Sequence, residues 1–384
     1  GYVTLRTLYG IYLLLSIMEK IFFIAGEPSG DLHASNLVKE MKLINPSLQI
    51  QGWGGELMSD QGVVLKNHLK NLSFMGFLEV FLNLRKILNN FKLCKNQLLE
   101  FQPDVIIMVD YPGFNLRMAK WAKKKGFKIV YYISPQIWAW KESRVKSIKA
   151  NIERMYCILP FEEDFYAKHN YKARYLGHPL MDEIAHFEAD RNKPVFKKNK
   201  PIISILPGSR EQEIDRKLGL MLSAVSKYTN FDIYVACAPN LDMKFFAEYK
   251  DQYSNVYFVS GKTYKLLLES DFAIVTSGTA TLETALFKVP QVVCYKSSNI
   301  SYFIARMVVD IKFISLVNLI LKREVVRELI QNDVNILNIQ KELDLLINDS
   351  YYRLDMLNGY DELIKKIGKE GCSKKIAQDL LEHY

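Results

Sequence analysis

The chain alternates short apolar runs with stretches of helical periodicity, and this rhythm occurs twice. The predicted strands of the first half are Ile21–Ala25, Leu48–Trp53, Val105–Val109, Lys128–Ile133 and Met155–Leu159, and those of the second half are Ile202–Leu206, Phe231–Cys237, Val256–Val259, Phe272–Val275 and Gln291–Tyr295. The helical stretches between them include Leu32–Ile44, Leu78–Phe101 and Asn115–Lys125. Continuous apolar runs are typical of parallel strands buried on both faces, and the intervening helices imply right-handed crossovers. The pattern predicts two doubly wound α/β domains.

The 384 residues are enough for two domains of ordinary size. The polar segment 187–200 is the predicted linker between an N-terminal domain, 18–186, and a C-terminal domain, 201–355. Helices over 356–384 are expected to pack back on the N-terminal domain or on a partner subunit. Two facing sheets of this kind leave an interdomain cleft at the carboxyl ends of their strands, where ligands bind.

The N-terminal segment 1–17 needs a separate interpretation. Its apolar part, Leu8–Ile17, is shorter than the ~20 residues that span a bilayer. It lacks the small-residue cleavage site of a signal peptide and runs directly into the first predicted strand. We expect Met18 to be the natural start and 1–17 to be an upstream extension. An interfacial anchor is the alternative.

Composition narrows the class of protein only in part. Hydrophobic residues make up 49% and charged residues 24%, which is typical of a globular chain. The net charge of +9 suits nucleic acid, an anionic membrane or phosphorylated substrates, and does not choose among them. The five cysteines are scattered without a C-x-x-C pair, and the six histidines show no metal-ligand spacing. We therefore expect a reducing cytosol, no zinc site and no bound metal.

The most informative turn follows the predicted strand that ends at Val275. Small residues there open a predicted helix, Leu282–Phe287, so that backbone N–H groups at its start are left unpaired. These donors and the helix dipole favour a phosphate, without a Walker lysine or a dinucleotide glycine fingerprint. The candidate phosphate-binding residues are Ser277, Gly278 and Thr279. Glu283, about one turn into the helix, is a candidate acceptor for both ribose hydroxyls. An ordinary capped turn is the alternative.

A second turn of this kind follows Leu206, at the end of the first strand of the second half. Its candidate residues are Gly208, Ser209 and Arg210. A guanidinium is permanently charged and can hold two phosphate oxygens at once. A helix start is an unfavourable place for a cation unless an anion binds there, which favours a functional role for Arg210 over an ordinary surface position.

In the first half, polar residues follow the first strand, within Gly26–His33. The candidate substrate-binding residues there are Glu27, Ser29, Gly30 and Asp31. The alternative is a capped strand–helix turn with Ser29 or Asp31 as N-cap. Two further candidates, Gln136 and Trp138, belong to the segment Ser134–Trp140, whose indoles either bind a ligand or pack in the core.

Asp110 ends the apolar run Val105–Val109 and is the candidate general base. A carboxylate at the tip of a buried strand is partly desolvated, which raises its pKa towards working pH. A helix cap is the alternative, but Pro112 and Gly113 stand between Asp110 and the predicted helix.

The segment Leu72–Leu82 holds eight large apolar residues in eleven, including the candidate substrate-binding residue Met75. One part must face a core, and the rest suits acyl chains or a membrane surface. Basic residues nearby in the sequence suit anionic head groups: Arg85, Lys86, Lys92 and Lys95. Core packing and membrane contact both remain open.

Taken together, these segments resemble the lipid-A-disaccharide synthase family. The resemblance runs from about Met18 to near the C-terminus, and the order of its motifs is highly specific. The matching segments are Gly26–Asp31, Phe74–Val80, Asp110–Asn115, Ser134–Trp140, Leu159–Glu162, Gly177–Pro179, Leu206–Arg210 and Ser277–Glu283.

The resemblance implies a GT-B fold and an inverting transfer from UDP-2,3-diacylglucosamine to 2,3-diacylglucosamine 1-phosphate. It implies an essential aspartate at Asp110, an arginine at Arg210, a glutamate at Glu283 and a donor-binding asparagine at Asn318. Val317 stands where the family has a proline, which puts the local backbone in doubt. Because the sequence contains no cluster of metal ligands, we expect no metal or cofactor. We also expect a cytoplasmic enzyme that is peripheral on the inner membrane, and a homodimer is left open.

Two other classes of function fit parts of the sequence. A UDP-sugar 2-epimerase would use a similar two-domain architecture and would need no acyl-binding surface. A nucleic-acid-binding protein would explain the net charge, but the sequence contains no recognised nucleic-acid module and no basic–aromatic repeat. We therefore expect no nucleic-acid partner.

Overall fold

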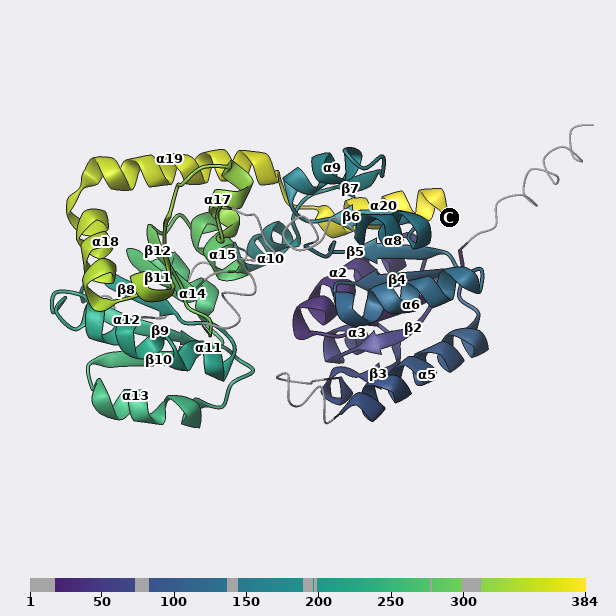
Figure 1. Cartoon of the computed structure of the whole chain (residues 1–384), viewed down its shortest axis with the longest axis horizontal. Helices are drawn as coiled ribbons and strands as arrows, with labels where there is room; N and C mark the ends of the chain where they lie inside the picture. Colours follow the sequence, from purple (N-terminus) through teal and green to yellow (C-terminus); the bar gives the residue numbers. More distant parts are fainter. Residues whose placement is uncertain are drawn as a thin grey trace, which may run out of the picture. The chain divides into compact units, whose positions relative to one another are not determined.

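The computed structural model describes residues 18–72, 83–136, 144–188, 196, 199–276, 278–298 and 312–384. The chain divides into two compact units, each built on its own parallel sheet (Figure 1). Unit 1 comprises Gly1–Asp182 and Glu370–Tyr384, and unit 2 comprises Glu183–Lys369. The division falls inside one helix, α10 (Pro179–Glu188). Two parallel α/β units confirm the predicted fold class.

Unit 1 contains a seven-stranded sheet in the order β3-β2-β1-β4-β5-β6-β7. Its strands are β1 (Lys20–Ala25), β2 (Gln49–Gly54), β3 (Val64–His68), β4 (Val105–Val109), β5 (Ile129–Tyr132), β6 (Arg154–Cys157) and β7 (Ala173–Tyr175). Its helices are α2 (Pro28–Ile44), α3 (Glu56–Asp60), η1 (Leu69–Asn71), α5 (Leu84–Phe101), α6 (Pro112–Lys124), α8 (Arg144–Asn151), α9 (Pro160–Ala167) and α20 (Cys372–His383), with α10 at the boundary.

Both faces of this sheet are buried, as the continuous apolar runs predict. Phe22 and Ile24 of β1 belong to one core cluster, with residues of α5, α6 and α8. Ile21 and Phe23, which point the other way, belong to a second cluster with residues of α2 and α20. Burying each such side chain contributes ~1.5–3 kcal/mol. β1 is an inner strand next to the central strand β4, and its end at Ala25 is in register with Val109 of β4.

Unit 2 contains a six-stranded parallel sheet in the order β10-β9-β8-β11-β12-β13. Its strands are β8 (Ile202–Leu206), β9 (Asp232–Cys237), β10 (Val256–Ser260), β11 (Phe272–Thr276), β12 (Gln291–Tyr295) and β13 (Arg327–Ile330). Its helices are α11 (Glu211–Asp215), α12 (Leu218–Val225), η2 (Met243–Phe246), α13 (Ala247–Gln252), α14 (Thr263–Glu269), α15 (Thr279–Leu286), α17 (Leu316–Leu321), η3 (Gln331–Asp333), α18 (Ile336–Asn348) and α19 (Ser350–Ile367).

All ten predicted strands are present, but three strands were not predicted: β3, β7 and β13. Each lies at an edge of its sheet. Edge strands are only partly covered by neighbours, and most positions of these three are half-buried or exposed, so they form no continuous apolar run.

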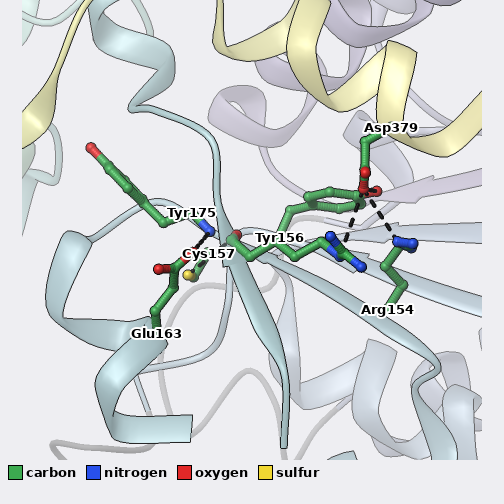
Figure 2. A network of polar contacts seen from close by, with 7 residues as sticks. Arg154, Tyr156, Cys157, Glu163, Tyr175 and Asp379 are labelled. Carbon is green, nitrogen blue, oxygen red and sulfur yellow. Dashed lines mark hydrogen bonds and ion pairs between the residues drawn. The ribbon is translucent and has the colours of Figure 1, made fainter. Parts of the chain in front are cut away.

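The last helix, α20, returns from unit 2 and packs on α2 of unit 1 (Figure 1). Its start is fixed by Asp182, whose carboxylate accepts hydrogen bonds from the N–H groups of Gly371 (2.5 Å) and Ser373 (3.2 Å). Its middle is fixed by Asp379. Figure 2 shows that the carboxylate of Asp379 meets the hydroxyl of Tyr156 and the guanidinium of Arg154, both on β6.

Within the described part of the chain, no helix combines the length and the apolar character that crossing a bilayer requires. The five cysteines are all buried and unpaired.

Candidate active site

Asp110 follows β4 in an unusual backbone conformation. Asp110 (φ 47°) and Tyr111 (φ 51°) are consecutive non-glycine residues in the left-handed region, which costs ~1–3 kcal/mol for each residue. The carbonyl oxygen of Asp110 accepts hydrogen bonds from the hydroxyl of Tyr131 (2.5 Å) and from Nδ2 of Asn115 (2.8 Å). The N–H of Asp110 donates to the carbonyl of Tyr132 (2.9 Å). The main chain of Asp110 is thus held in place from three directions.

The carboxyl group of Asp110 is suited to accept a proton. Burial, reinforced by the nearby carboxylate of Glu27, raises the pKa of Asp110 to about 6, although a hydrogen bond from the backbone of Tyr111 opposes the shift. Such a group is mostly ionised near pH 7 and is still basic enough to take a proton. The helix-cap alternative does not apply, because the N-cap of α6 is Tyr111. α6 begins at Pro112, so Pro112 and Gly113 are its first residues and not a separate spacer.

The turn after β1 lies beside Asp110, because β1 and β4 are neighbours in register. Position 26 requires glycine, because a Cβ atom there would lie 2.4 Å from the ring of Tyr111. Glu27 and Ser29 are exposed, and Gly30 is buried. Because α2 begins at Pro28 with Glu27 as N-cap, the alternative in which Ser29 or Asp31 is the N-cap of this helix is wrong.

Asp31 has a structural role in unit 1. Its buried carboxylate accepts hydrogen bonds from the N–H groups of Gly55 (2.9 Å), Leu57 (3.3 Å) and Met58 (3.1 Å). It thereby caps the start of α3 from a distant part of the chain, as a helix N-terminus favours. A contact between Asp31 and a substrate stays a prediction.

The remaining candidates of the first half follow β5 or lie outside the described residues. Gln136 is exposed after the buried pair Ser134 and Pro135. Met75 and Trp138 lie outside the described residues, as do the rest of Phe74–Leu82 and most of the predicted linker. Ser277 of the second half lies outside them too.

In unit 2 the turn after β8 carries Arg210. Gly208 has φ 115°, which favours glycine, and the carbonyl of Ser209 accepts a hydrogen bond from Nδ2 of Asn240 (3.1 Å). Arg210 is the exposed N-cap of α11, and the described residues offer its guanidinium no ion-pair partner. The guanidinium is therefore available to an anionic ligand.

The neighbouring strand β11 leads to the start of α15. Gly278 has φ 100° and is its N-cap, and both Gly278 and Thr279 are exposed. Thr281 folds back and donates its hydroxyl to the carbonyl of Gly278 (2.8 Å). An exposed helix start of this kind leaves backbone N–H groups that can bind an anion. The helix begins three residues earlier than predicted.

Glu283 lies in the second turn of α15 and is largely surrounded by protein. Burial raises its pKa to about 7, and hydrogen bonds from Tyr264 and Thr279 oppose the shift. The side chain of Tyr264, on α14, thus orients the carboxyl group that is the candidate ribose acceptor.

Asn318 is fully buried on α17. Its Oδ1 accepts from the N–H groups of Val325 (2.7 Å) and Val326 (3.0 Å), and its Nδ2 donates to the carbonyl of Val326 and to Glu328. Its side chain serves the local fold, and a contact with a donor nucleotide stays a prediction. Val317 is the second residue of α17, where proline is also tolerated, so the substitution preserves the helix start.

Three residues that position Asp110 or Glu283 within their own units were not predicted: Asn115, Tyr131 and Tyr264. Asn115 lies in the segment Asp110–Asn115. Its hydrogen bond to Asp110 could have been predicted by treating that segment as one turn. Tyr131 and Tyr264 carry no signal in the sequence, since only strand order and helix packing bring them to Asp110 and Glu283. Across the described ranges, no three His, Cys, Asp or Glu side chains cluster as metal ligands would.

Comparison of the fold with solved structures gives the structural class of the protein. UDP-GlcNAc 2-epimerase from Neisseria meningitidis aligns with a TM-score of 0.66 at 14% identity, covering 94% of this chain and 100% of that one. A glycosyltransferase of kitacinnamycin aligns with a TM-score of 0.66 at 12% identity, covering 95% and 99%. At such identities the likeness concerns the fold alone, which is that of GT-B proteins.

Sequence comparison then gives the family. The family model for lipid-A-disaccharide synthetase matches residues 21–379. The lipid-A-disaccharide synthase of Myxococcus xanthus is 37% identical over 371 residues, which cover 94% of this chain and 97% of that protein. Lipid-A-disaccharide synthase 1 of Legionella pneumophila is 38% identical over 350 residues, which cover 88% and 91%. The chain belongs to the lipid-A-disaccharide synthase family, whose members are glycosyltransferases, and the epimerase likeness reflects shared fold.

Proposed function

We propose that the chain transfers 2,3-diacylglucosamine from UDP-2,3-diacylglucosamine to the 6-hydroxyl of 2,3-diacylglucosamine 1-phosphate. The products are a β-1,6-linked disaccharide 1-phosphate and UDP. Family membership supports a UDP-sugar donor and a glucosamine-phosphate acceptor. The observation that carries the proposal furthest is Asp110, a carboxyl group at the end of β4 with a pKa raised to about 6.

In this proposal Asp110 acts as the general base. It takes the proton of the acceptor 6-hydroxyl while that oxygen attacks the anomeric carbon of the donor. A new C–O bond forms, and the bond from the anomeric carbon to the UDP oxygen breaks on the opposite face, which inverts the configuration. The fixed main chain around Asp110 supports this role, because a base is effective only when it is held within reach of the proton.

The leaving UDP gains negative charge, and unit 2 is proposed to stabilise it. The N–H groups at the start of α15 and the guanidinium of Arg210 are positive groups at the ends of neighbouring strands, β11 and β8. Groups already oriented towards a developing charge lower the barrier most. Glu283 is proposed to accept hydrogen bonds from the ribose hydroxyls.

Because these groups supply the positive charge, we expect catalysis without a metal ion. Turnover by enzyme dialysed against EDTA should match that of the untreated enzyme. Arg210→Ala should weaken UDP binding by ~1.5–3 kcal/mol, as expected for a lost hydrogen-bonded charge. Loss of activity on chelation that Mg²⁺ or Mn²⁺ restores would overturn the first expectation, and unchanged UDP affinity in calorimetry would overturn the second.

The reaction itself is tested by mass spectrometry of products. The enzyme is incubated with UDP-2,3-diacylglucosamine alone, with the acceptor alone, and with both. A transferase yields the tetra-acylated disaccharide 1-phosphate only when both substrates are present. An epimerase, the alternative that the fold permits, would convert the donor alone to an isomer of equal mass, which chromatography resolves.

We also infer a peripheral contact between unit 1 and an anionic inner-membrane surface. On α5, Leu84 and Leu88 are 54% and 61% exposed, one helical turn apart, and Lys92 follows one turn later on the same face. Exposed leucines beside basic residues suit the boundary between head groups and acyl chains. The apolar segment Phe74–Leu82 immediately precedes this helix in the sequence.

A further inference from the structure

Unit 2 contains a lysine whose charged end is enclosed by protein. Lys217 is 1% exposed and lies in the short link between α11 and α12. Its Nζ atom donates hydrogen bonds to Oε1 of Glu213 (3.2 Å) and to the hydroxyl of Thr276. The hydroxyl of Thr276 in turn donates to the same oxygen of Glu213 (2.9 Å). Burying an ammonium group costs free energy even when the group is paired. The cluster of these three side chains therefore indicates a role beyond packing.

The cluster of Lys217, Glu213 and Thr276 lies next to both turns of the proposed donor site. Thr276 is the last residue of β11, two residues before Gly278. The carboxylate of Glu213 touches the other turn, because a Cβ atom on Gly208 would lie 2.8 Å from Oε2 of Glu213. β8 and β11 are adjacent strands, so their carboxyl ends meet at this point. One carboxylate therefore braces the turn at Gly208 and the end of β11 at once.

Charge makes Lys217 necessary to this arrangement. An uncompensated carboxylate next to Gly208 would repel a diphosphate bound at the same turn. Lys217 cancels that charge within hydrogen-bonding distance. Burial lowers the pKa of Lys217 and Arg216 lowers it further, while the charge of Glu213 and its hydrogen bond favour the charged form of Lys217. The pair as a whole presents no net negative charge to the turns.

We propose that Lys217 is a positioning residue of the diphosphate subsite. With Glu213 and Thr276 it fixes the turns at Gly208 and Gly278, and it neutralises Glu213 so that the subsite accepts two phosphates. The inference rests on the proposed donor site and deepens it. Lys217 does not touch the nucleotide in this account, so its effect must depend on the number of phosphates that the ligand carries.

The test compares the binding of uridine, UMP and UDP by calorimetry. Lys217→Met removes the charge at similar volume, and should weaken UDP ~10- to 100-fold, UMP less, and uridine by no more than about twofold. The double variant Glu213→Gln/Lys217→Met lacks both charges and should recover most of the UDP affinity. Lys227→Met, which removes an exposed lysine of the same unit, controls for net charge and should bind like the parent.

A loss of equal size for uridine and UDP in Lys217→Met would indicate a merely structural role and overturn the proposal. So would unchanged UDP affinity, or a double variant no better than the single one. If Lys217→Met does not fold, Lys217→Gln keeps hydrogen-bonding capacity without charge and carries the same expectations. A parent enzyme that binds no UDP would refute the proposed donor site itself, an outcome distinct from a parent that binds UDP and a variant that binds it equally.

Discussion

Two carboxyl groups, one in each unit, have pKa values raised for the same physical reasons. Asp110 is half-buried near Glu27, and Glu283 is half-buried near Glu183. In each pair the neighbouring carboxylate adds to the effect of desolvation, which disfavours ionisation. The consequence differs with the role. A raised pKa makes Asp110 a better base, whereas for Glu283 it makes ligand binding depend on pH near neutrality.

The binding of uridine should therefore strengthen as pH rises through about 7, the pKa of Glu283. Below that pH the group is protonated and accepts hydrogen bonds from two ribose hydroxyls less well, and above it the carboxylate accepts both. Uridine is the suitable probe because it carries no phosphate that titrates in this range. Inhibition constants for uridine between pH 6 and 8 measure the effect.

In Glu283→Gln the same measurement should show weak binding with little dependence on pH. A pH dependence that persists unchanged in this variant would assign the titration to another group.

At the scale of elements, the packing of α20 on unit 1 should depend on the carboxylate of Asp379. Removing the carboxylate leaves Arg154, whose side chain is 9% exposed, without its anion, and leaves the hydroxyl of Tyr156 without its acceptor (Figure 2). Breaking a largely buried pair from one side costs ~3–5 kcal/mol. We expect Asp379→Ala to lower the free energy of local opening of α20 and β6 by about this amount, measured by hydrogen exchange of peptides from unit 1.

Asp361→Ala is the matched control. Asp361 pairs with Lys288 in an ion pair in which both side chains are more than half exposed, and such pairs contribute ~0–1 kcal/mol. If Asp379→Ala opens no more easily than this control, the network is not what holds α20 to unit 1.

The elements also show what the sequence could and could not predict. Inner strands such as β4 are recognisable because neighbours cover both faces, and every residue of Val105–Val109 is buried. Val64 of β3 is 55% exposed, so an edge strand lacks this signal. For the site, Asp110 and Arg210 could be proposed from the sequence, because each lies in the turn after an inner strand and carries a charged side chain. Lys217 was not predicted, because its proposed role depends on which turns lie next to it in the folded chain.

At the scale of the whole molecule, the inferred membrane contact predicts behaviour with vesicles. Replacing both Leu84 and Leu88 by serine should reduce co-sedimentation with anionic vesicles at least about tenfold, since two leucines no longer enter the acyl boundary. High salt should weaken only the electrostatic part, ~1 kcal/mol for each basic residue near the surface.

Leu354→Ser provides the control for this comparison. Leu354 is 54% exposed on α19 of unit 2, and its replacement should leave vesicle binding unchanged. Equal losses in the two variants, or no loss in the Leu84/Leu88 variant, would contradict a contact through α5. Variants in the adjacent segment, at Met75, Phe77 and Leu78, extend the same test.

The most direct test of the account is the initial rate of disaccharide formation by Asp110→Asn, quantified by mass spectrometry beside the parent enzyme. Asparagine keeps the shape of the side chain and removes its basicity, so turnover should fall by ~10²–10⁴-fold while folding and UDP affinity stay unchanged. In the parent, kcat/KM for the acceptor at saturating donor should rise with pH through about 6, the pKa of Asp110, and the variant should lose this dependence. Near-normal turnover by the folded variant would contradict the central claim that Asp110 is the general base.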